Sequence, residues 1–285
     1  MLTCSKVNLS LAVTAVRPNG YHELDSVFYP FHDPSDEIAI EDAPEGIAIR
    51  CDAPGVPLDP RKNLCGKAAV AYFRAAKRPV PGLVIHLKKN IPVAAGMGGG
   101  SADGATVLRL LQEKYGALTS GKMESVAFSL GADVPFFLNP LPSHVTGAGE
   151  HHVPIEGLPE NQRLPLLLAA PQFPVSAAWA YDHMDLEWAM SHPPSTKGLI
   201  RALRRSDYEA AASMMRNDLE DALFDKFPLL VLLREFLLEH GALRAMISGS
   251  GPTMLALFAD EAAAQAVCAQ GKASFDPTVR WILPR

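Results

Sequence analysis

The sequence predicts a protein of the α/β class, in the two-layer α+β sense, with one large domain or two of ordinary size. Its 285 residues exceed the usual length of one domain and are enough to bury a core. Apolar residues alternate in some segments and recur at helical spacing in others. A proline-rich stretch near 154–165, with Pro154, Pro159 and Pro165, is the best candidate for a domain boundary.

Strand patterns dominate the first third of the chain. Residues 7–16 alternate and are rich in Val and Leu, which predicts a strand. The Arg-Pro-Asn-Gly run at 17–20 is a turn signal, and a second strand is expected over about 24–31. With shorter strands at 36–41 and 46–51, we expect a mostly antiparallel sheet.

Helix patterns become frequent further along. Asn63 is placed to cap a helix over about 64–77, and a strand is expected at 83–88. One helix should follow residue 101, and another should end at Gly131. The second half predicts strands at 166–170, 243–248 and 253–258, and helices near 176–190, 207–222 and 228–240.

The composition excludes several classes of function. The net charge is 26 − 31 = −5 and the isoelectric point is near 6.0, so the basic footprint of a nucleic-acid-binding protein is missing. The four cysteines form no Cys-x-x-Cys pair. No signal peptide and no apolar run of about 18 residues is present. We expect a cytoplasmic protein that binds neither nucleic acid nor membranes.

The segment 96–100 holds four glycines in five residues, directly before a predicted helix. Glycine lets the backbone approach an anion closely and adopt positive φ. The start of a helix adds N–H groups and partial positive charge. The segment is therefore typical of a polyphosphate cradle, although a flexible turn or close packing of a strand on a helix is an alternative.

Two standard nucleotide motifs do not fit. The run at 116–122 has the glycine and lysine spacing of a P-loop, but Met123 stands where Ser or Thr must reach Mg²⁺. The residues before it also have a helical pattern. The dinucleotide pattern fails because its last glycine would fall on Ser101 or Asp103. The glycine segment is thus a phosphate loop of neither kind.

Residues 92–102, with Asp103 and Ala105 after them, resemble the P-x-x-x-G-L-G-S/G-S-S-A signature of the galactokinase, homoserine kinase, mevalonate kinase and phosphomevalonate kinase family. Met97 replaces the usual Leu, Ala102 a frequent Ser, and Gly104 the usual Ala. The resemblance assigns ATP binding to the whole loop: Pro92, Val93, Ala94, Ala95, Gly96, Met97, Gly98, Gly99, Gly100, Ser101 and Ala102.

Two further stretches narrow the resemblance. Residues 6–9 with 17–24, and 130–137, are similar to segments of the diphosphocytidyl-methylerythritol kinases, one group of this family. Residues 247–253 resemble the family's third, C-terminal glycine motif. The matches spread over nearly the whole chain and fall in the right order.

The resemblance implies a two-domain small-molecule kinase fold. Residues 1–155 would form the N-terminal ATP-binding and catalytic domain, and 156–285 would complete the substrate cleft. ATP with Mg²⁺ would phosphorylate the C2 hydroxyl of the methylerythritol unit of a cytidine-diphosphate substrate, in non-mevalonate isoprenoid precursor synthesis. No residue is assigned as a metal ligand, and a monomer or homodimer is expected.

The resemblance also assigns catalytic roles. Phosphoryl transfer asks a protein for positioning and charge stabilisation, and a carboxylate can take the proton of the alcohol. Asp133 matches the family's catalytic aspartate, and Lys6 matches the basic residue that stabilises transferring charge. Without the resemblance, the ordinary interpretations are favoured: Asp133 as a turn residue two positions before Pro135, and Lys6 as a solvated surface charge.

The cytidine end needs aromatic rings and hydrogen bonds to the base. Tyr21 and His22 match the family's cytosine-binding pair, and Tyr181 lies near a position that supplies a second ring. Asn8 is assigned to contact the substrate. Each residue also has a purely structural alternative. Tyr21 could be a half-buried core residue, His22 a histidine of a turn, and Asn8 a residue whose side chain forms hydrogen bonds with backbone groups.

Other functions remain open at this point. A mevalonate or homoserine kinase of the same family is one alternative, which the Gly20-Tyr21-His22 run argues against. A non-catalytic family member acting as a binding protein should have lost the lysine or the aspartate, and this chain keeps both. A structural or interaction module would leave the glycine loop unexplained.

Overall fold

The computed structural model describes residues 1–158 and 164–284, so Pro159 of the predicted boundary lies outside the described residues. The chain forms two compact units, and each is assembled from segments far apart in the sequence. Unit 1 comprises Met1–Ser5, Pro34–Val93 and Gly98–Pro140; unit 2 comprises Lys6–Asp33, Ala94–Met97 and Leu141–Arg285. The two units therefore do not coincide with the expected domains 1–155 and 156–285, because both units contain segments from the first 155 residues. The assignment of ATP to the first half and of the substrate to the second stays a prediction.

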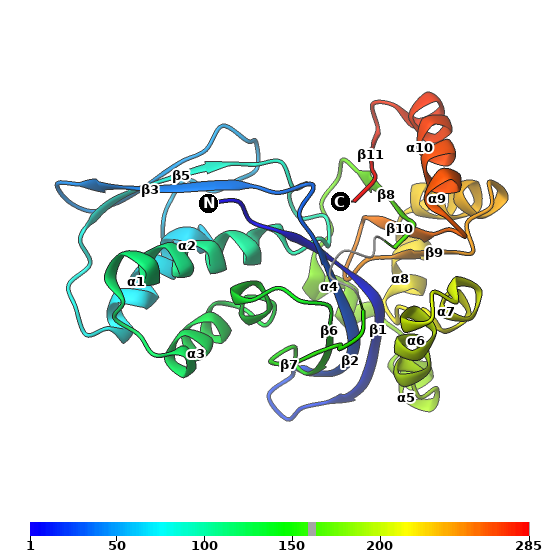
Figure 1. Cartoon of the computed structure of the whole chain (residues 1–285), viewed down its shortest axis with the longest axis horizontal. Helices are drawn as coiled ribbons and strands as arrows, with labels where there is room; N and C mark the ends of the chain where they lie inside the picture. Colours follow the sequence, from blue (N-terminus) through cyan, green and yellow to red (C-terminus); the bar gives the residue numbers. More distant parts are fainter. Residues whose placement is uncertain (159–163, 285) are drawn as a thin grey trace. The chain divides into compact units, whose positions relative to one another are not determined.

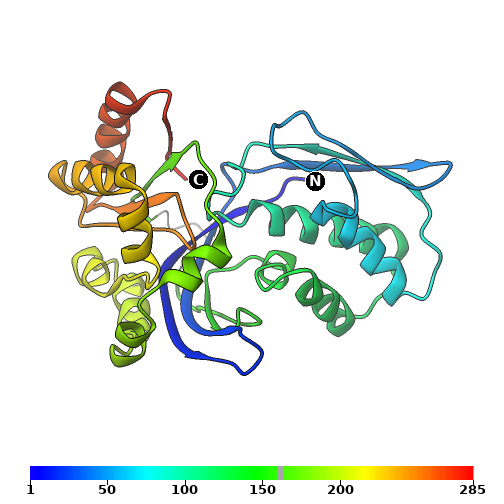
Figure 2. The same ribbon diagram turned by 180° about the vertical axis from the view of Figure 1, so that it is seen from behind.

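Unit 1 is a three-stranded sheet with helices packed on it. Strand β5 (Gly82–Lys88) lies in the centre, antiparallel to β3 (Glu37–Ala43) and parallel to β4 (Ile47–Arg50). The helical elements gather on one face of the sheet in both views (Figure 1, Figure 2). They are α1 (Leu64–Ala75), α2 (Gly99–Tyr115), α3 (Ser120–Leu130) and the 3₁₀ helix η1 (Pro135–Leu138).

Asn63 and Gly131, the two predicted caps, lie at helix ends in unit 1, whereas the C-terminal cap of α2 was not predicted. The Asn63 side chain accepts a hydrogen bond from the Cys65 N–H at 2.8 Å, so it caps α1 as expected. Helix α2 ends at Gly116, which adopts φ +57°. The run at 116–122 therefore follows a helix rather than a strand, which confirms that it is no P-loop.

Unit 2 contains two four-stranded sheets. The first has the order β1-β2-β6-β7 and the second the order β11-β8-β10-β9. The first is built from β1 (Ser5–Val16), β2 (His22–Phe31), β6 (Ser143–Gly147) and β7 (His151–Pro154). The second is built from β8 (Leu166–Pro171), β9 (Arg244–Ile247), β10 (Met254–Leu257) and β11 (Val279–Ile282). The prediction of one sheet in the first third is wrong, because β1 and β2 belong to a different sheet from β3 and β4.

Seven helices lie in the described part of unit 2. They are α4 (Ala177–His183), α5 (Leu186–Ser191), α6 (Thr196–Arg204), α7 (Tyr208–Met214), α8 (Glu220–Lys226), α9 (Pro228–Glu239) and α10 (Glu261–Phe275). The helix predicted at 176–190 is interrupted at Asp185, whose side chain caps α5. The helix predicted at 207–222 is interrupted between Met214 and Glu220.

The core of unit 2 lies between the second sheet and its helices. All six residues of β8 and all four of β10 are buried. Leu230, Leu233 and Leu237 recur at helical spacing on α9 and are fully buried in the same cluster. These contacts hold β9 and β10 in place, and the turn between them leads directly to the candidate site. No helix in residues 1–158 or 164–284 combines the length and the apolarity needed to cross a membrane.

Candidate functional site

Lys6 and Asn8 lie two residues apart on β1 and therefore face the same side of the strand. The Lys6 Nζ donates a hydrogen bond to Asn8 Oδ1 at 2.7 Å and lies 4.3 Å from the centroid of the Phe28 ring. Only 4% of Lys6 is exposed. Because a buried ammonium group needs polar partners, the alternative that Lys6 is a solvated surface charge is wrong.

Asn8 orients this lysine. Its side-chain oxygen accepts the hydrogen bond from Lys6, and its amide nitrogen donates to Ser26 Oγ at 3.0 Å. The Ser26 hydroxyl in turn donates to the carbonyl of Ser10. The Asn8 amide is thus occupied by two side chains and does not serve to satisfy the backbone.

A turn at 248–251 lies against this pair. The Ser248 hydroxyl accepts a hydrogen bond from the Asn8 N–H at 3.3 Å and donates to the Gly96 carbonyl at 3.2 Å. A Cβ on Gly249 would lie 3.1 Å from Asn8 Oδ1 and 3.7 Å from Lys6 Nζ. The structure therefore brings together Lys6, Asn8 and Gly96 of the predicted site with the late glycine motif.

The glycine loop has a conformation suited to an anion. The φ angle is +53° at Ala94, +76° at Gly96 and +72° at Gly98, whereas Ala95 and Met97 do not have positive φ. Alternation of this kind turns successive N–H groups toward one concave side, which is the geometry of a backbone nest for anions. The backbone of residues 94–98 thereby acquires a physical role that the glycine count alone did not show.

The carbonyls of the loop are used within unit 2. Thr253 donates its N–H to Ala95 O at 3.3 Å, and Lys6 donates its N–H to Met97 O at 3.1 Å. Gly96 is required by packing, because a Cβ there would lie 2.3 Å from the Ser248 carbonyl oxygen. The loop is therefore anchored through its carbonyl side.

Helix α2 begins immediately after the loop. Gly98 is its N-cap and offers no side-chain cap, so the N–H groups of the first turn need other partners. Gly100 is exposed, and a Cβ there would meet nothing within 4 Å. Ser101 is half-buried in the same turn. An uncapped helix start with an open approach is favourable for phosphate.

A buried ion cluster supports the start of α2. Lys89 Nζ pairs with Asp103 Oδ2 at 2.8 Å and with Asp36 Oδ2. The other oxygen of Asp36 accepts the N–H groups of Asn90 and Ile91 at 2.6 and 2.8 Å. Burial raises the pKa of Asp103 to about 7, and Asp36 adds to that effect while Lys89 opposes it. No local pattern indicated this cluster, because Asp36 and Lys89 lie 53 residues apart.

Asp133 lies in the turn between α3 and η1 in unit 1, where the Val134 N–H donates to the Gly131 carbonyl at 3.1 Å. Its side chain is half-buried and takes part in interactions within the described structure. A turn residue before Pro135 is thus what the structure contains, and this does not conflict with a catalytic role. Since Lys6 belongs to unit 2, its pairing with Asp133 stays a prediction.

The predicted cytidine residues lie near the β1–β2 hairpin. Tyr21 is 57% exposed, so the alternative that it is half-buried core is wrong. The rings of His22 and Tyr181 are stacked with centroids 4.8 Å apart and planes 28° apart. Burial lowers the pKa of His22, so at neutral pH its ring can both donate and accept a hydrogen bond.

Arg17 fixes this hairpin. Its backbone N–H donates to the Tyr21 carbonyl at 2.7 Å. Its side chain donates through Nε to Glu23 at 2.6 Å and through a terminal nitrogen to Glu150 at 2.7 Å. The sequence marked 17–20 only as a turn, and the partner Glu150 could not be found from spacing.

Models of the GHMP kinase family match the chain in two places. The model described as "GHMP kinases N terminal domain" matches residues 63–139, and the one described as "GHMP kinases C terminal" matches residues 199–276. Together they cover more than half of the chain.

Two curated relatives with the same name match most of this chain. A 4-diphosphocytidyl-2-C-methyl-D-erythritol kinase of Synechococcus sp. (strain JA-3-3Ab) is 39% identical over 275 residues, covering 93% of this chain and 87% of the relative. One from Nitratidesulfovibrio vulgaris (strain Hildenborough) is 38% identical, covering 94% and 92%.

Solved structures of the same family superpose on this chain. A 4-(cytidine 5′-diphospho)-2C-methyl-D-erythritol kinase superposes with a TM-score of 0.78 at 31% identity, covering 99% of this chain and 97% of that one. A homoserine kinase from Cytophaga hutchinsonii, at 22% identity and a TM-score of 0.75, covers 98% of this chain and 93% of its own and shares the fold. The chain therefore belongs to the GHMP kinase family, in the group of the 4-diphosphocytidyl-2-C-methyl-D-erythritol kinases.

Proposed function

We propose that the protein transfers the γ-phosphoryl group of ATP to the 2-hydroxyl of 4-diphosphocytidyl-2-C-methyl-D-erythritol. The products are ADP and the 2-phosphate, and the step belongs to non-mevalonate isoprenoid precursor synthesis. The observation that carries the proposal is the buried Lys6–Asn8 pair beside the anchored glycine loop. The names of the curated relatives support the choice of substrate.

The glycine loop binds the phosphates of ATP in this proposal. The alternating φ angles of residues 94–98 supply a nest of N–H groups, and the first turn of α2 supplies further donors with the positive end of its dipole. These donors are fixed before ATP arrives. Positioning without reorganisation is the main contribution a protein makes to phosphoryl transfer.

Lys6 and Asp133 divide the remaining chemistry. The ammonium group of Lys6, held by Asn8, stabilises negative charge on the transferring phosphoryl group and on the Asp133 carboxylate. Asp133 accepts the proton of the 2-hydroxyl as that oxygen forms its bond to phosphorus. The bond between the γ-phosphorus and the bridging oxygen breaks, and ADP leaves with the electron pair.

In this proposal a Mg²⁺ ion arrives bound to ATP. Within residues 1–158 and 164–284 no group of three His, Cys, Asp or Glu residues is placed to hold a metal. Mg²⁺ in kinases is held by substrate phosphates and water with only one or two protein oxygens, so such a group is not required. The ion would neutralise charge on the ATP phosphates.

The cytidine end is assigned to Tyr21, His22 and Tyr181. The exposed Tyr21 ring offers a face for the base, and His22, stacked on Tyr181, presents its ring nitrogens for a hydrogen bond. A cytoplasmic location and a monomeric or homodimeric state are further parts of the proposal.

An acceptor panel tests this function. ADP release should be measured with ATP and Mg²⁺ in the presence of 4-diphosphocytidyl-2-C-methyl-D-erythritol, mevalonate, homoserine or galactose. Only the cytidine compound should give robust turnover. Strong turnover of mevalonate or homoserine instead would reject the substrate while keeping the family, and no turnover of any acceptor would favour a binding protein.

A further inference from the structure

The segment 216–220 covers most of the break between α7 and α8 together with the first residue of α8. Its first part, residues 216–218, runs beside strand β1. Arg216 O accepts the N–H of Leu11 at 2.8 Å, and the Asp218 N–H donates to Leu11 O at 3.0 Å. Leu11 and Asn217 thereby form a parallel bridge. The same strand carries Lys6 and Asn8 at its start, so the segment is attached to the strand that presents the candidate catalytic lysine.

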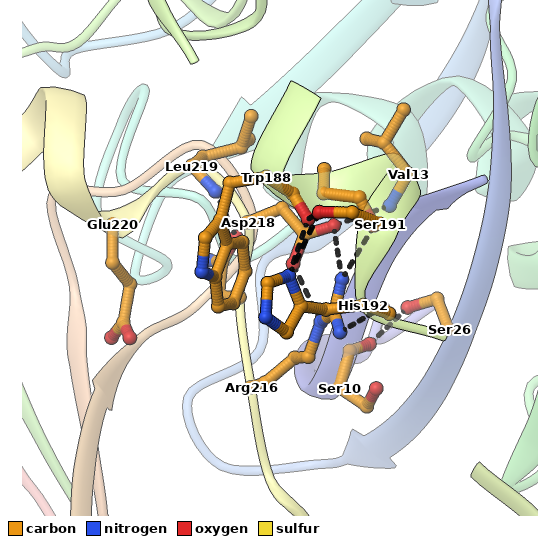
Figure 3. Close-up of polar contacts among 12 residues, drawn as sticks. Ser10, Val13, Ser26, Trp188, Ser191, His192, Arg216, Asp218, Leu219 and Glu220 are labelled. Carbon is orange, nitrogen blue, oxygen red and sulfur yellow. Dashed lines mark hydrogen bonds and ion pairs between the residues drawn. The ribbon is translucent and has the colours of Figure 1, made fainter. Parts of the chain in front are cut away.

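Ion pairing fixes the ends of this attachment. Asp218 Oδ2 accepts the Val13 N–H at 2.8 Å, and both of its oxygens pair with the Arg216 guanidinium, at 2.7 and 2.9 Å. That guanidinium also donates to the His192 carbonyl and lies over the Trp188 ring, 4.9 Å from its centroid. Figure 3 shows the Arg216 side chain lying among Asp218, His192 and Trp188. An Arg–Asp pair joined by two hydrogen bonds has little freedom to shift.

Asn217 joins the segment to the turn that follows β9. Its amide nitrogen donates to the carbonyls of Ile247 and Gly249, each at 2.7 Å. Its side-chain oxygen accepts the Leu219 N–H at 3.0 Å, and only 5% of Asn217 is exposed. Both amide protons are therefore used on the 248–251 turn and the residue before it. Glu220 adds a bond on the same side by accepting the Ile247 N–H at 2.8 Å.

These contacts connect two parts of the candidate site that are distant in the sequence. On one side the segment is bonded to β1, which carries Lys6 and Asn8. On the other, Asn217 holds the carbonyl of Gly249, whose Cβ position lies 3.1 Å from Asn8 Oδ1. A shift of this turn would disturb the Lys6–Asn8 pair directly.

We propose that Asn217 is a positioning residue for the phosphoryl-transfer site, acting through the 248–251 turn on Lys6 and Asn8; this rests on the proposed function. Only a donor of two hydrogen bonds suits the site, because two carbonyl oxygens face it. An alanine would leave both carbonyls without their donor, and an aspartate of the same shape would set a carboxylate against them.

The test compares Asn217→Ala and Asn217→Asp with Asn63→Ala. Asn63 is also a buried asparagine that holds a turn, but it caps α1 and has no part in the proposed site. At a temperature where all variants are folded, both Asn217 variants should lower kcat by about 10- to 100-fold, the effect of a small misplacement of catalytic groups. Asn63→Ala should lose stability and keep its kcat. A normal kcat in the Asn217 variants would overturn the proposal.

A double-mutant cycle separates positioning from general damage. In a Lys6→Ala background, Asn217→Ala should lower kcat by less than about 3-fold, because residues that act through one another are not additive. An effect as large as in the wild-type background would show that Asn217 acts independently of Lys6 and would contradict the proposal.

Amide hydrogen exchange gives a readout that needs no substrate. The N–H groups of Ser248 and Gly251 are bonded within the turn, to Thr253 O and Ser248 O. The peptide covering 246–254 should exchange its amide hydrogens faster in Asn217→Ala than in Asn63→Ala, when the two variants are compared under conditions that give them the same global free energy of unfolding. Equal exchange would show that Asn217 does not hold the turn. If the wild-type protein turned over no acceptor, the proposed function would fail while this measurement still decided the structural part.

Discussion

The His22 ring lies stacked on the Tyr181 ring, with centroids 4.8 Å apart, and 159 positions of sequence separate the two residues. The stack holds His22 beside Tyr21, the exposed residue that precedes it at the start of β2. It gives Tyr181 a role that the weak sequence match did not: supporting the histidine of the proposed cytidine site.

Tyr21→Ala should raise KM for the cytidine substrate and leave KM for ATP nearly unchanged. Loss of one stacking ring costs about 1–3 kcal/mol, which is about 5- to 150-fold in affinity. Tyr21→Phe keeps the ring and should be mild. Both KM values should be measured beside the melting temperature, and an equal loss for both substrates would contradict the assignment.

Asp133→Asn should lower kcat by about 10²- to 10⁴-fold, because the amide keeps the shape but cannot accept the proton. ATP affinity should be little changed. Steady-state kinetics with an ATP-binding titration would check this, with Lys6→Ala as a second variant that should also lower kcat. A folded Asp133→Asn enzyme with near-normal kcat would remove the aspartate from the mechanism.

Gly100→Ala tests whether phosphate approaches the start of α2. The added Cβ meets no protein atom within 4 Å, and alanine favours a helix over glycine by up to about 1 kcal/mol. The variant should therefore be at least as stable as the wild type, yet bind ATP more weakly, because the methyl group occupies the space of the phosphate.

Gly121→Ala is the matched control for that variant. Gly121 is likewise the second residue of a helix and is exposed, and a Cβ added there would also meet nothing within 4 Å. It should show the same gain in stability with an unchanged Kd for ATP, measured by calorimetry. Equal ATP affinity in both variants would show that the ATP phosphates do not bind beside Gly100.

Much of the fold follows from local patterns. Asn63 caps its helix as predicted, and the apolar stripe of α9 is buried as its spacing requires. Helix α10 was missed although Asp260 caps it and accepts the Ala263 N–H at 2.8 Å. The cap signal was present there, but the alanine-rich sequence behind it has a weak apolar periodicity.

The rest depends on contacts between distant residues. The helical pattern of 207–222 is broken in the structure, because bonds with Leu11 and Val13 hold residues 216–218 beside β1. No pattern within 207–222 encodes a partner 205 positions away, as Val13 is from Asp218. The Lys89–Asp36 pair was invisible for the same reason. Lys6 and Asn8 could be proposed only by resemblance, and the structure adds that they bond each other.

Glu220 should make stability depend on pH. Burial raises its pKa from 4.5 to about 7 in the folded protein, against the opposing charge of Arg244. The folded state therefore binds the proton more tightly than the unfolded chain does. The stability linked to this group is fully present below pH 4.5 and is lost as the pH rises toward 7.

Glu220→Gln keeps an acceptor for the Ile247 N–H and removes the titration. The free energy of unfolding should be measured by urea titration at about pH 5 and about pH 7.5 for both proteins. Between these two pH values the wild type should lose about 1–3 kcal/mol more stability than Glu220→Gln. Glu187→Gln, which removes an exposed carboxyl of α5, controls for the loss of one negative charge. Identical pH profiles for Glu220→Gln and wild type would contradict the buried titration.

The most direct test of the central claim is the identity of the phosphorylated product. The protein should be incubated with Mg²⁺, ATP and 4-diphosphocytidyl-2-C-methyl-D-erythritol, and the mixture followed by ³¹P NMR. The account predicts one new phosphomonoester signal that grows in step with ADP, while the signals of the cytidine diphosphate linkage stay unchanged. The new signal should show no three-bond coupling to a proton, because the tertiary carbon that carries the 2-hydroxyl bears no hydrogen. ADP formed with inorganic phosphate alone, or a phosphate carried by another hydroxyl, would contradict it.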